Sequence, residues 1–422
     1  HPHRDHPHWK HDLMSNHSTR DAIVLGLLTM VSPFAIDMYL PALPEITRLF
    51  GATEHQVQAS LMSFMLAVGC GQLIAGPLSD MYGRKRPLYV GLVIFLIGSI
   101  GCTFAPTIGA LIACRLLQGL GACAIMVIPR AMVRDLHTGP EAARLMSLLM
   151  MIYSVSPILA PLIGSFIADH TGWRSIFGLL AILAAVGLVM LRLFLPETRP
   201  ASARAQSGVS AAFHNYRILL SDPHFLAVSV IASVSLAGFF VYIGNSSFIM
   251  QTHYGLSPAG YSMIFAINAV SFVITSQTTG RLARHFGFRK VIRMAIIGQA
   301  CATLLLLALI LAGIDALPLV VVLLAAVFGF MGFILPSTFV LAMERHASRA
   351  GTASALIGTF NFAGGAAAVA AVSPFINGTP LPMVAGIAAC AVIVLLVGLT
   401  MLGGRAEAAA HGAAAEGAAG RS

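Results

Sequence analysis

The sequence predicts an all-α integral membrane protein whose twelve transmembrane helices form two pseudo-symmetric six-helix bundles. Three observations support this fold class. The chain is 57% hydrophobic and only 10% charged, whereas soluble domains carry about 25% charged residues. Apolar runs of about 20 residues, the length that an α-helix needs to cross a bilayer, recur along the whole chain. A distinctive loop in the first half, at 76–90, has a second copy in the second half, at 280–294.

Twelve spans follow one another along the chain, each an apolar run between polar or proline-containing connections. Most connections are short, so we expect neighbouring spans to be antiparallel. The expected spans are 22–43, 56–78, 88–106, 108–130, 144–168, 174–195, 224–248, 258–279, 290–313, 316–342, 351–374 and 380–403.

The longest internal connection, 196–223, divides these spans six and six. Its Pro, Ser, Ala and Arg content suits a cytoplasmic linker. The first bundle is therefore expected at 22–195 and the second at 224–403. Residues 1–21 lack the apolar core of a signal peptide and form an expected cytoplasmic tail. Residues 404–422, rich in Ala and Gly, form an expected flexible cytoplasmic tail.

The basic residues predict the orientation of the chain. All but four of the 25 Lys and Arg residues lie on the side of the predicted membrane that holds both termini. The exceptions are Arg48 and Arg174, in loops on the other side, and Arg115 and Arg130, within spans. By the positive-inside rule, both termini are cytoplasmic. The same distribution explains the net charge of +9 without a nucleic-acid partner.

Other features exclude several function classes. The chain contains no nucleotide-binding GxxxxGK[ST] loop, which argues against an ATP-driven pump. The six cysteines fall in apolar runs and show neither a disulfide framework nor a metal spacing. No set of nucleophile, base and acid converges, so we expect no enzyme, no cofactor and no metal site.

The repeated loop points to internal symmetry. Its first copy, GPLSDMYGRKRPLYV, lies between spans two and three, and its second, GRLARHFGFRKVIRM, between spans eight and nine. Two glycines and a leucine coincide, and a basic cluster follows in both copies. Parallel repeats of this kind place a substrate site at the interface between the halves, near the middle of the membrane.

Asp37 is the only one of the sixteen acidic residues that lies well inside an apolar run. A carboxylate within a span costs about 2.5–3.5 kcal/mol on insertion scales, so such a residue is a functional candidate. We expect Asp37 to couple transport to protons, because burial disfavours a charged carboxyl group and water restores it. The alternative is a structural carboxylate near the outer interface, close to the helix break at Pro41 and Pro44.

Four segments resemble a known family. The loop GPLSDMYGRKR at 76–86 resembles the signature loop of the major facilitator superfamily. DMYLPALP at 37–44, RLLQGLGA at 115–122 and GTASALIGTF at 351–360 resemble the Bcr/CflA branch of drug:proton antiporters. The resemblance implies the major facilitator fold and alternating access. It also implies proton-coupled export of small drugs across a bacterial cytoplasmic membrane by a functional monomer.

Arg115 lies at a depth in the fourth span that matches the depth of Asp37 in the first. The resemblance implies an arginine that faces the cavity and assists proton transfer. The alternative is a structural arginine that satisfies backbone carbonyls of the first span, and whether Arg115 pairs with Asp37 stays open. Arg130, near the inner end of the same span, is expected to snorkel to the cytoplasmic interface. If it instead faced the cavity, it would favour neutral or anionic substrates.

The loop after the second span is interpreted as a conformational latch. Asp80 and Arg84 are spaced to pair at a helix end, and the dipole at the start of the eleventh span would attract Asp80. The alternative is a loop that only fixes topology by its positive charge. The latch candidates are Gly76, Asp80, Gly83, Arg84 and Asp135.

The fifth span contains SVSPILAPLIGS at 154–165, in which Pro157 and Pro161 bend the helix and Gly164 admits a close neighbour. The antiporter signature of the family has glycines where Ser156, Ala160 and Ser165 stand. We interpret the segment as an antiporter-type kink, with a simple packing kink as the alternative.

Polar and aromatic groups within the spans supply candidates for the substrate cavity, because an amide or ring on an apolar wall suits an amphipathic ligand. The alternative is that they tie helices together. The candidates are Tyr39, Gln118, Tyr242, Asn245, Asn268, Phe360 and Asn361.

The sequence therefore predicts a proton-driven exporter of bicyclomycin-, chloramphenicol- or sulfonamide-like drugs, with the lipid bilayer, protons and the drug as its partners. One alternative is an exporter of a metabolite, such as an amino acid or a sugar, that uses the same machinery. A facilitative channel or a receptor is a further alternative.

Overall fold

The computed structural model describes residues 8–137 and 139–402, and the regular structure in these ranges is helical throughout. Twelve helical segments within them are long and apolar enough to cross a membrane, which confirms the predicted all-α fold with twelve spans. The tail expected at 404–422 and the first seven residues of the tail expected at 1–21 lie outside the described residues.

Nine of the twelve spans in the described residues are single α-helices, and the other three, the first, the seventh and the eleventh, change helix type near an end. The helices are α1 (His8–Asp37), α2 (Leu43–Phe50), α3 (Glu54–Tyr82), α4 (Lys85–Thr103), α5 (Ile108–Leu136), α6 (Gly139–Thr171), α7 (Arg174–Phe194), α8 (Ala201–Gln206), α9 (Val209–Leu220), α10 (Pro223–Phe248), α11 (Pro258–Phe286), α12 (Phe288–Leu311), α13 (Leu317–Met343), α14 (Ala350–Val372) and α15 (Leu381–Met401).

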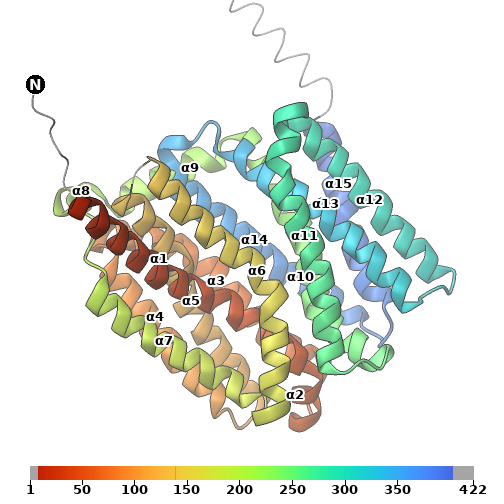
Figure 1. Cartoon of the computed structure of the whole chain (residues 1–422). Helices are drawn as coiled ribbons and strands as arrows, with labels where there is room; N and C mark the ends of the chain where they lie inside the picture. The colour runs from red at the N-terminus through yellow and green to blue at the C-terminus, as the bar shows by residue number, and fades with distance from the viewer. Residues whose placement is uncertain (1–7, 138, 403–422) are drawn as a thin grey trace, which may run out of the picture.

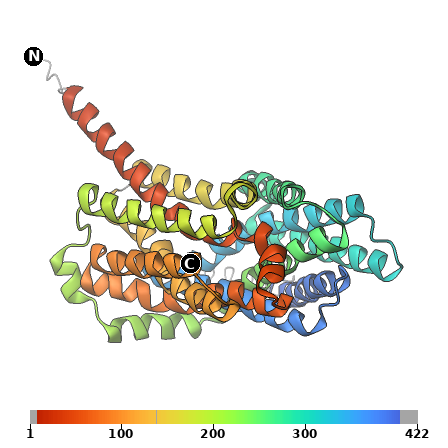
Figure 2. The same ribbon diagram turned by 90° about the horizontal axis from the view of Figure 1, so that it is seen from below.

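The two halves lie side by side and meet along two pairs of helices (Figure 1). α3 packs against α14, and α6 packs against α11. We call the end of the bundle where α1 begins and α15 ends the terminal end, and the opposite end the far end. In Figure 1 the terminal end faces the upper left, and α2, at the bottom, marks the far end. Figure 2 shows that the first turns of α1 extend beyond the rest of the bundle.

The structure adds detail at two element boundaries. The first helix starts at His8, well before the expected start of the span, because no proline or glycine interrupts the segment that follows Pro7. The linker also holds two helices, α8 and α9. Leu219 of α9 is buried, so this linker is docked on the bundle rather than only connecting its halves.

Local sequence signals explain where several spans start and stop. Thr53 and Gln56 form a capping box at the start of α3, with the Thr53 hydroxyl accepting from the Gln56 amide. Ser257 caps α11 in the same manner. Gly83 and Gly287, at equivalent positions within the two copies of the repeated loop, end α3 and α11 at φ 90° and 83°, a backbone conformation that favours glycine.

Buried hydrophobic side chains form two clusters that are arranged differently at the two ends. The larger cluster runs from the first half into the part of α10 and α11 near the far end, through residues such as Tyr242 and Phe265. The smaller cluster, which includes Phe225 and Ile292, takes its buried members from the second half and the linker. The apolar core is therefore continuous between the halves at the far end.

Candidate functional site

Asp37 is the last residue of α1, at the point where the first span breaks. Pro41 has no amide hydrogen, so it cannot donate to the carbonyl of Asp37, and the α-helix ends there. The chain continues as a short 3-10 turn, Leu40–Ala42, and then as α2. The residue is 5% exposed, and its carboxylate accepts one hydrogen bond, from Ser156 Oγ of α6 at 3.2 Å. Within the described ranges the carboxylate has no further hydrogen bond and no ion pair.

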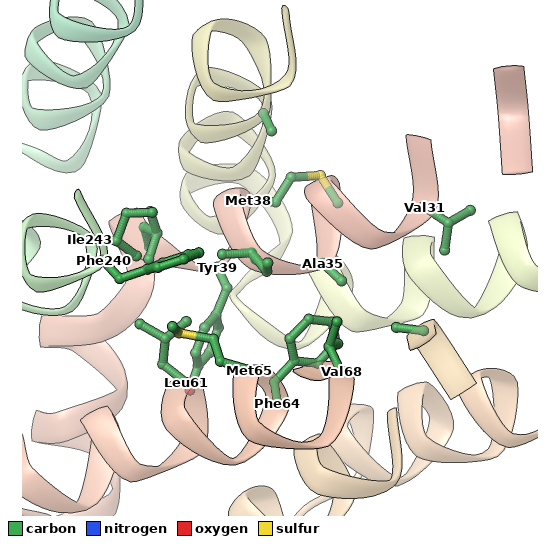
Figure 3. Close-up of a cluster of buried hydrophobic side chains, with 14 of the residues drawn as sticks. Val31, Ala35, Met38, Tyr39, Leu61, Phe64, Met65, Val68, Phe240 and Ile243 are labelled. Atoms are coloured by element: carbon green, nitrogen blue, oxygen red, sulfur yellow. The ribbon is translucent and has the colours of Figure 1, made fainter. Parts of the chain in front are cut away.

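Arg115 of α5 is completely buried beside the break in the first span. Its Nη1 donates to the carbonyl oxygen of Ala35 at 2.9 Å and to Gln118 Oε1 at 2.8 Å. The guanidinium carbon lies 4.4 Å from the ring centroid of Phe64 and 4.7 Å from that of Tyr39. Figure 3 shows Tyr39, Ala35 and Phe64 within one cluster of buried side chains. The guanidinium group is thus held by rings and by the backbone of α1.

The structure brings Asp37 and Arg115 close along α1 without joining them. Arg115 binds the carbonyl two residues before Asp37, while Asp37 binds Ser156. Nε and Nη2 of Arg115 are buried without an acceptor among the described residues. The two residues therefore lie at similar depth, because Arg115 contacts α1 two residues before Asp37. In this conformation they form no ion pair, since each has its own partners.

The predicted substrate-cavity residues separate into two groups. In this conformation, Tyr39, Gln118, Tyr242, Asn245 and Asn268 are buried and hydrogen-bonded to other side chains or backbone. For example, Asn268 Nδ2 donates to the Tyr242 hydroxyl at 2.8 Å.

Phe360 and Asn361 of α14 form the second group and are half-buried. Asn361 accepts a hydrogen bond from Ser233 Oγ at 3.0 Å. These two residues keep part of their surface free near the interface of the halves.

Hydrogen bonds that join the two halves concentrate at the far end, a feature that the sequence analysis did not find. Ser247 Oγ donates to the carbonyl of Leu40 at 2.6 Å, and Gln251 Nε2 donates to the carbonyl of Pro41 at 2.9 Å. Pro44, four residues later, has no amide hydrogen, so the carbonyl of Leu40 accepts from the Leu43 amide of the 3-10 turn and keeps room for Ser247. The prolines after Asp37 were therefore a usable signal for this contact.

Two further bonds add to this seam. Gln58 Nε2 of α3 donates to the carbonyl of Gly244 at 2.8 Å, and Ser262 Oγ of α11 donates to the carbonyl of Pro161 at 3.0 Å. Phe240 and Ile243 of α10 also lie against the first half in Figure 3. The far end is thus closed by polar and apolar contacts.

The predicted latch residues gather around Arg84, which is 6% exposed. Its Nη1 donates to Asp80 Oδ1 and Ser79 Oγ, both at 2.7 Å, and its Nε donates to Asp135 Oδ2 at 2.8 Å. One arginine therefore connects the end of α3 with the end of α5.

The linker supplies three more members of this cluster, which the sequence analysis treated only as linker. Glu197 accepts from the backbone amides of Arg84 at 2.8 Å and Lys85 at 3.1 Å. Thr198 donates to Asp135, and Arg199 donates to the carbonyl of Asp80, each at 2.8 Å. An acidic residue directly after the sixth span, in the sequence LPETRP, was the available signal.

The environment of Glu197 changes its proton affinity. Partial burial acts to raise the pKa of the Glu197 carboxyl. Hydrogen bonds from the amides of Arg84, Arg199 and Lys85 outweigh this effect, so its pKa lies below the ordinary value. Glu197 is therefore a carboxylate at neutral pH that fixes the loop backbone.

The two latch glycines differ in their roles. Gly83 has φ 90°, a conformation that strains any residue with a side chain, and a Cβ there would also lie 2.6 Å from a carboxylate oxygen of Glu197. At Gly76, a Cβ would lie 4.0 Å from Ala355, an ordinary contact, so packing in this conformation does not require glycine there. A cavity of about 230 Å³ beside Gly76 separates Asp80 from the start of α14.

The two prolines of the predicted antiporter-type kink lie inside α6, which continues through both. Gly164 packs against the chain just after Asp37, because a Cβ there would overlap the carbonyl oxygen of Met38. The close approach permitted by this glycine lets Ser156, two turns earlier on α6, reach Asp37.

Arg130 does not snorkel towards the terminal end. Its guanidinium carbon lies 5.1 Å from the ring centroid of Tyr153 on α6. Tyr153 is near the middle of α6, whereas Arg130 is within two turns of the end of α5 at Leu136. The side chain therefore extends towards the interior, because an aromatic ring on the neighbouring helix offers a cation–π contact.

Known proteins share the sequence and the fold of this chain. A family model described as the Major Facilitator Superfamily matches residues 25–369. The uncharacterized MFS-type transporter YdgK of Bacillus subtilis is 36% identical over 342 residues, which are 80% of this chain and 84% of that protein.

Two further proteins resemble the chain. The bicyclomycin resistance protein homolog of Haemophilus influenzae is 28% identical over 377 residues, which are 89% of this chain and 94% of that protein. Among solved structures, a D-xylose-proton symporter superposes with a TM-score of 0.67 at 17% identity and covers 91% of this chain and 97% of its own. The structural likeness concerns the fold alone.

Proposed function

Because the chain belongs to the Major Facilitator Superfamily, a family of multi-pass membrane transporters and not of enzymes, we propose that it exports small amphipathic drugs in exchange for protons. The drugs would be bicyclomycin-, chloramphenicol- or sulfonamide-like. The membrane would be the bacterial cytoplasmic membrane, with both chain ends in the cytoplasm. The relative named for bicyclomycin resistance supports the substrate class, and the distribution of basic residues supports the orientation.

One observation carries the proton-coupling part of the proposal, namely the isolation of Asp37. Its carboxylate is buried with a single hydrogen bond, from Ser156, and within the described chain no cation pairs with it. A buried charge without a partner costs several kcal/mol, and binding a proton removes this cost. When the halves move and water reaches the break after α1, hydration stabilises the charged carboxylate of Asp37, and the proton is released. Asp37 would therefore be protonated in one conformation and deprotonated in the other.

Arg115 would act on this step through the backbone of α1. It holds the carbonyl of Ala35 and is itself held by the rings of Tyr39 and Phe64. A movement of α1 that exposes Asp37 must therefore carry this contact along or break it. The positive charge would also stabilise Asp37 once the proton has left, without forming a pair that would prevent its return.

Alternating access would follow because the far end is closed in this conformation and the terminal end is less tightly joined. The seam of Ser247, Gln251 and Gln58 closes the far end in this conformation. At the terminal end, a cavity separates Asp80 from the start of α14. In the opposite conformation, the start of α14 would move towards Asp80, whose charge its helix dipole attracts. We expect Asp80→Asn to slow transport while substrate binding is retained.

The coupling experiment measures proton release from purified protein in proteoliposomes when chloramphenicol or a sulfonamide is added. We expect the wild type to release protons and Asp37→Asn to release none, although the variant still inserts into the membrane. Asp169→Asn, which removes an exposed acid near the end of α6, is the matched control and should behave as wild type. Unchanged release from Asp37→Asn would contradict the proposal.

A further inference from the structure

An arginine and a tyrosine with unused hydrogen-bonding atoms lie together in the first half, on the side that faces the second half. Arg130 of α5 rests on the ring of Tyr153 of α6 at 5.1 Å. Arg130 Nε and the Tyr153 hydroxyl are both buried atoms without a hydrogen-bond partner among the described residues. Buried polar atoms are normally satisfied by protein, water or a ligand. This pair therefore has hydrogen-bonding capacity that the rest of the fold does not use.

The position of Tyr153 on its helix shows which way the pair faces. Tyr153 precedes Ser156, which reaches Asp37 beside α1, and Pro161, which accepts from Ser262 of α11. At 3.6 residues per turn, Tyr153 lies on the face of α6 between these two directions. That face looks into the interior between α1 and α11, which belong to different halves. Arg130 reaches the same place from α5.

The pair also lies towards the end of the bundle that is less tightly joined. Arg130 is within two turns of the end of α5 at the terminal end. The hydrogen bonds that tie the halves together, such as that of Ser247 with Leu40, concentrate at the far end. A molecule that approaches from the terminal end therefore meets Arg130 before it reaches the level of Asp37.

Within the described chain, no carboxylate of the neighbouring elements forms an ion pair with Arg130. Asp21 of α1 lies 3.4 Å from His137, and Asp37 binds Ser156. Asp80 and Asp135 pair with Arg84, and Glu141 pairs with Arg144. The other acid of α6, Asp169, lies near the opposite end of that helix from Arg130. Arg134, one turn further along α5, adds a second positive charge. The local charge is positive.

We propose that Arg130 and Tyr153 form an anion-recognising contact that makes this transporter favour acidic or strongly electronegative substrates over organic cations. The inference rests on the export function proposed above and narrows its substrate class. The guanidinium and the phenol would both donate to a carboxylate or sulfonamide anion. An organic cation would be repelled by a charge that the low-dielectric interior screens poorly.

The test compares three probes in proteoliposomes that contain the full chain: the carboxylate nalidixate, neutral chloramphenicol and the cation ethidium. We expect Arg130→Gln to lower nalidixate transport about tenfold relative to chloramphenicol, the effect of one charge-assisted hydrogen bond. Arg130→Glu should raise ethidium transport relative to chloramphenicol. Tyr153→Phe, which keeps the ring, should lower nalidixate transport by a smaller factor.

Two controls separate selectivity from damage. Arg130→Lys keeps the charge and should keep the preference for nalidixate even if Arg130→Gln is poorly folded. Arg192→Gln removes an exposed arginine at the same end of the bundle and should change no ratio. The proposal is overturned if the Arg130 variants change all three probes equally, or if the wild type prefers ethidium. If the wild type moves none of the probes, the export function itself fails as well.

Discussion

Ser247 of α10 donates a hydrogen bond of 2.6 Å to the carbonyl of Leu40, the residue that starts the 3-10 turn after Asp37. This bond joins the two halves directly at the break in the first span. Pro44 cannot donate the α-helical bond to the Leu40 carbonyl, which instead accepts from the Leu43 amide and from Ser247. The proposed proton site and the closure of the far end therefore share one short stretch of backbone.

Removing this bond should weaken closure of the far end. One buried hydrogen bond contributes about 1 kcal/mol, or about a fivefold change in a two-state equilibrium. We expect Ser247→Ala to increase the population that is open at the far end, measured by distances between spin labels on the two halves. Ser246→Ala is the matched control, because Ser246 bonds Tyr261 of its own half. Equal distance distributions for the two variants would contradict this role.

Arg115→Lys should destabilise the protein strongly. Lysine keeps the charge but cannot stack on Tyr39 and Phe64 while it donates to Ala35 and Gln118. We expect a loss of about 3 kcal/mol, because the group is fully buried. Thermal unfolding in detergent measures this loss.

Arg174 is a matched control for that substitution. It stacks on Trp173 at 4.5 Å and donates to the carbonyl of Thr103 at 2.9 Å, but it is exposed. Arg174→Lys should cost less than about 1 kcal/mol. Similar losses of stability in Arg115→Lys and Arg174→Lys would show that burial does not determine the contribution of Arg115 to stability.

Gly164→Ala should separate α6 from the first span. A Cβ at this position overlaps the carbonyl oxygen of Met38, and the overlapping atoms belong to the backbone, so one helix has to shift to make room. We expect strongly reduced transport and a lower melting temperature, with a cost of about 1–3 kcal/mol. Gly178→Ala on α7 is the control, since nothing lies within 4 Å of its Cβ. It should be neutral or slightly stabilising, because alanine favours the helix.

The Glu197 carboxylate should make stability depend on pH at the terminal end. Its pKa in the folded protein is lower than the ordinary value near 4.3. Its contribution is therefore complete above about pH 4.3 and is lost as the pH falls through the lower, folded pKa. We expect Glu197→Gln to lower stability by about 1 kcal/mol at pH 7, a small value because the residue is exposed.

Melting curves of wild type and Glu197→Gln between pH 7 and pH 3.5 provide the measurement. The difference between the two proteins should stay constant down to about pH 4.5 and shrink below it. A difference that grows on acidification has the wrong sign and would exclude Glu197 as the group responsible.

Several features could be read from local sequence because a short stretch of chain determines them. The bilayer requires about 20 apolar residues per span, so the apolar runs along the sequence predicted twelve spans. Asp37 stood out because it is an acid within such a run. Asp80 and Arg84 could be placed together because residues four apart share a helix face.

The partners of the central charges depended on tertiary structure. Ser156, Ala35 and the ring of Tyr153 lie on helices other than those of Asp37, Arg115 and Arg130, which they contact. Such contacts depend on how each helix is rotated and tilted against its neighbours, which hydrophobicity along one span does not encode. For the same reason, the acid in LPETRP and the prolines after Asp37 mark unusual positions, but the sequence does not show that Glu197 meets the loop or that the far end is closed. The sequence therefore determined which groups are chemically unusual, and the packing of the helices decided which of them meet.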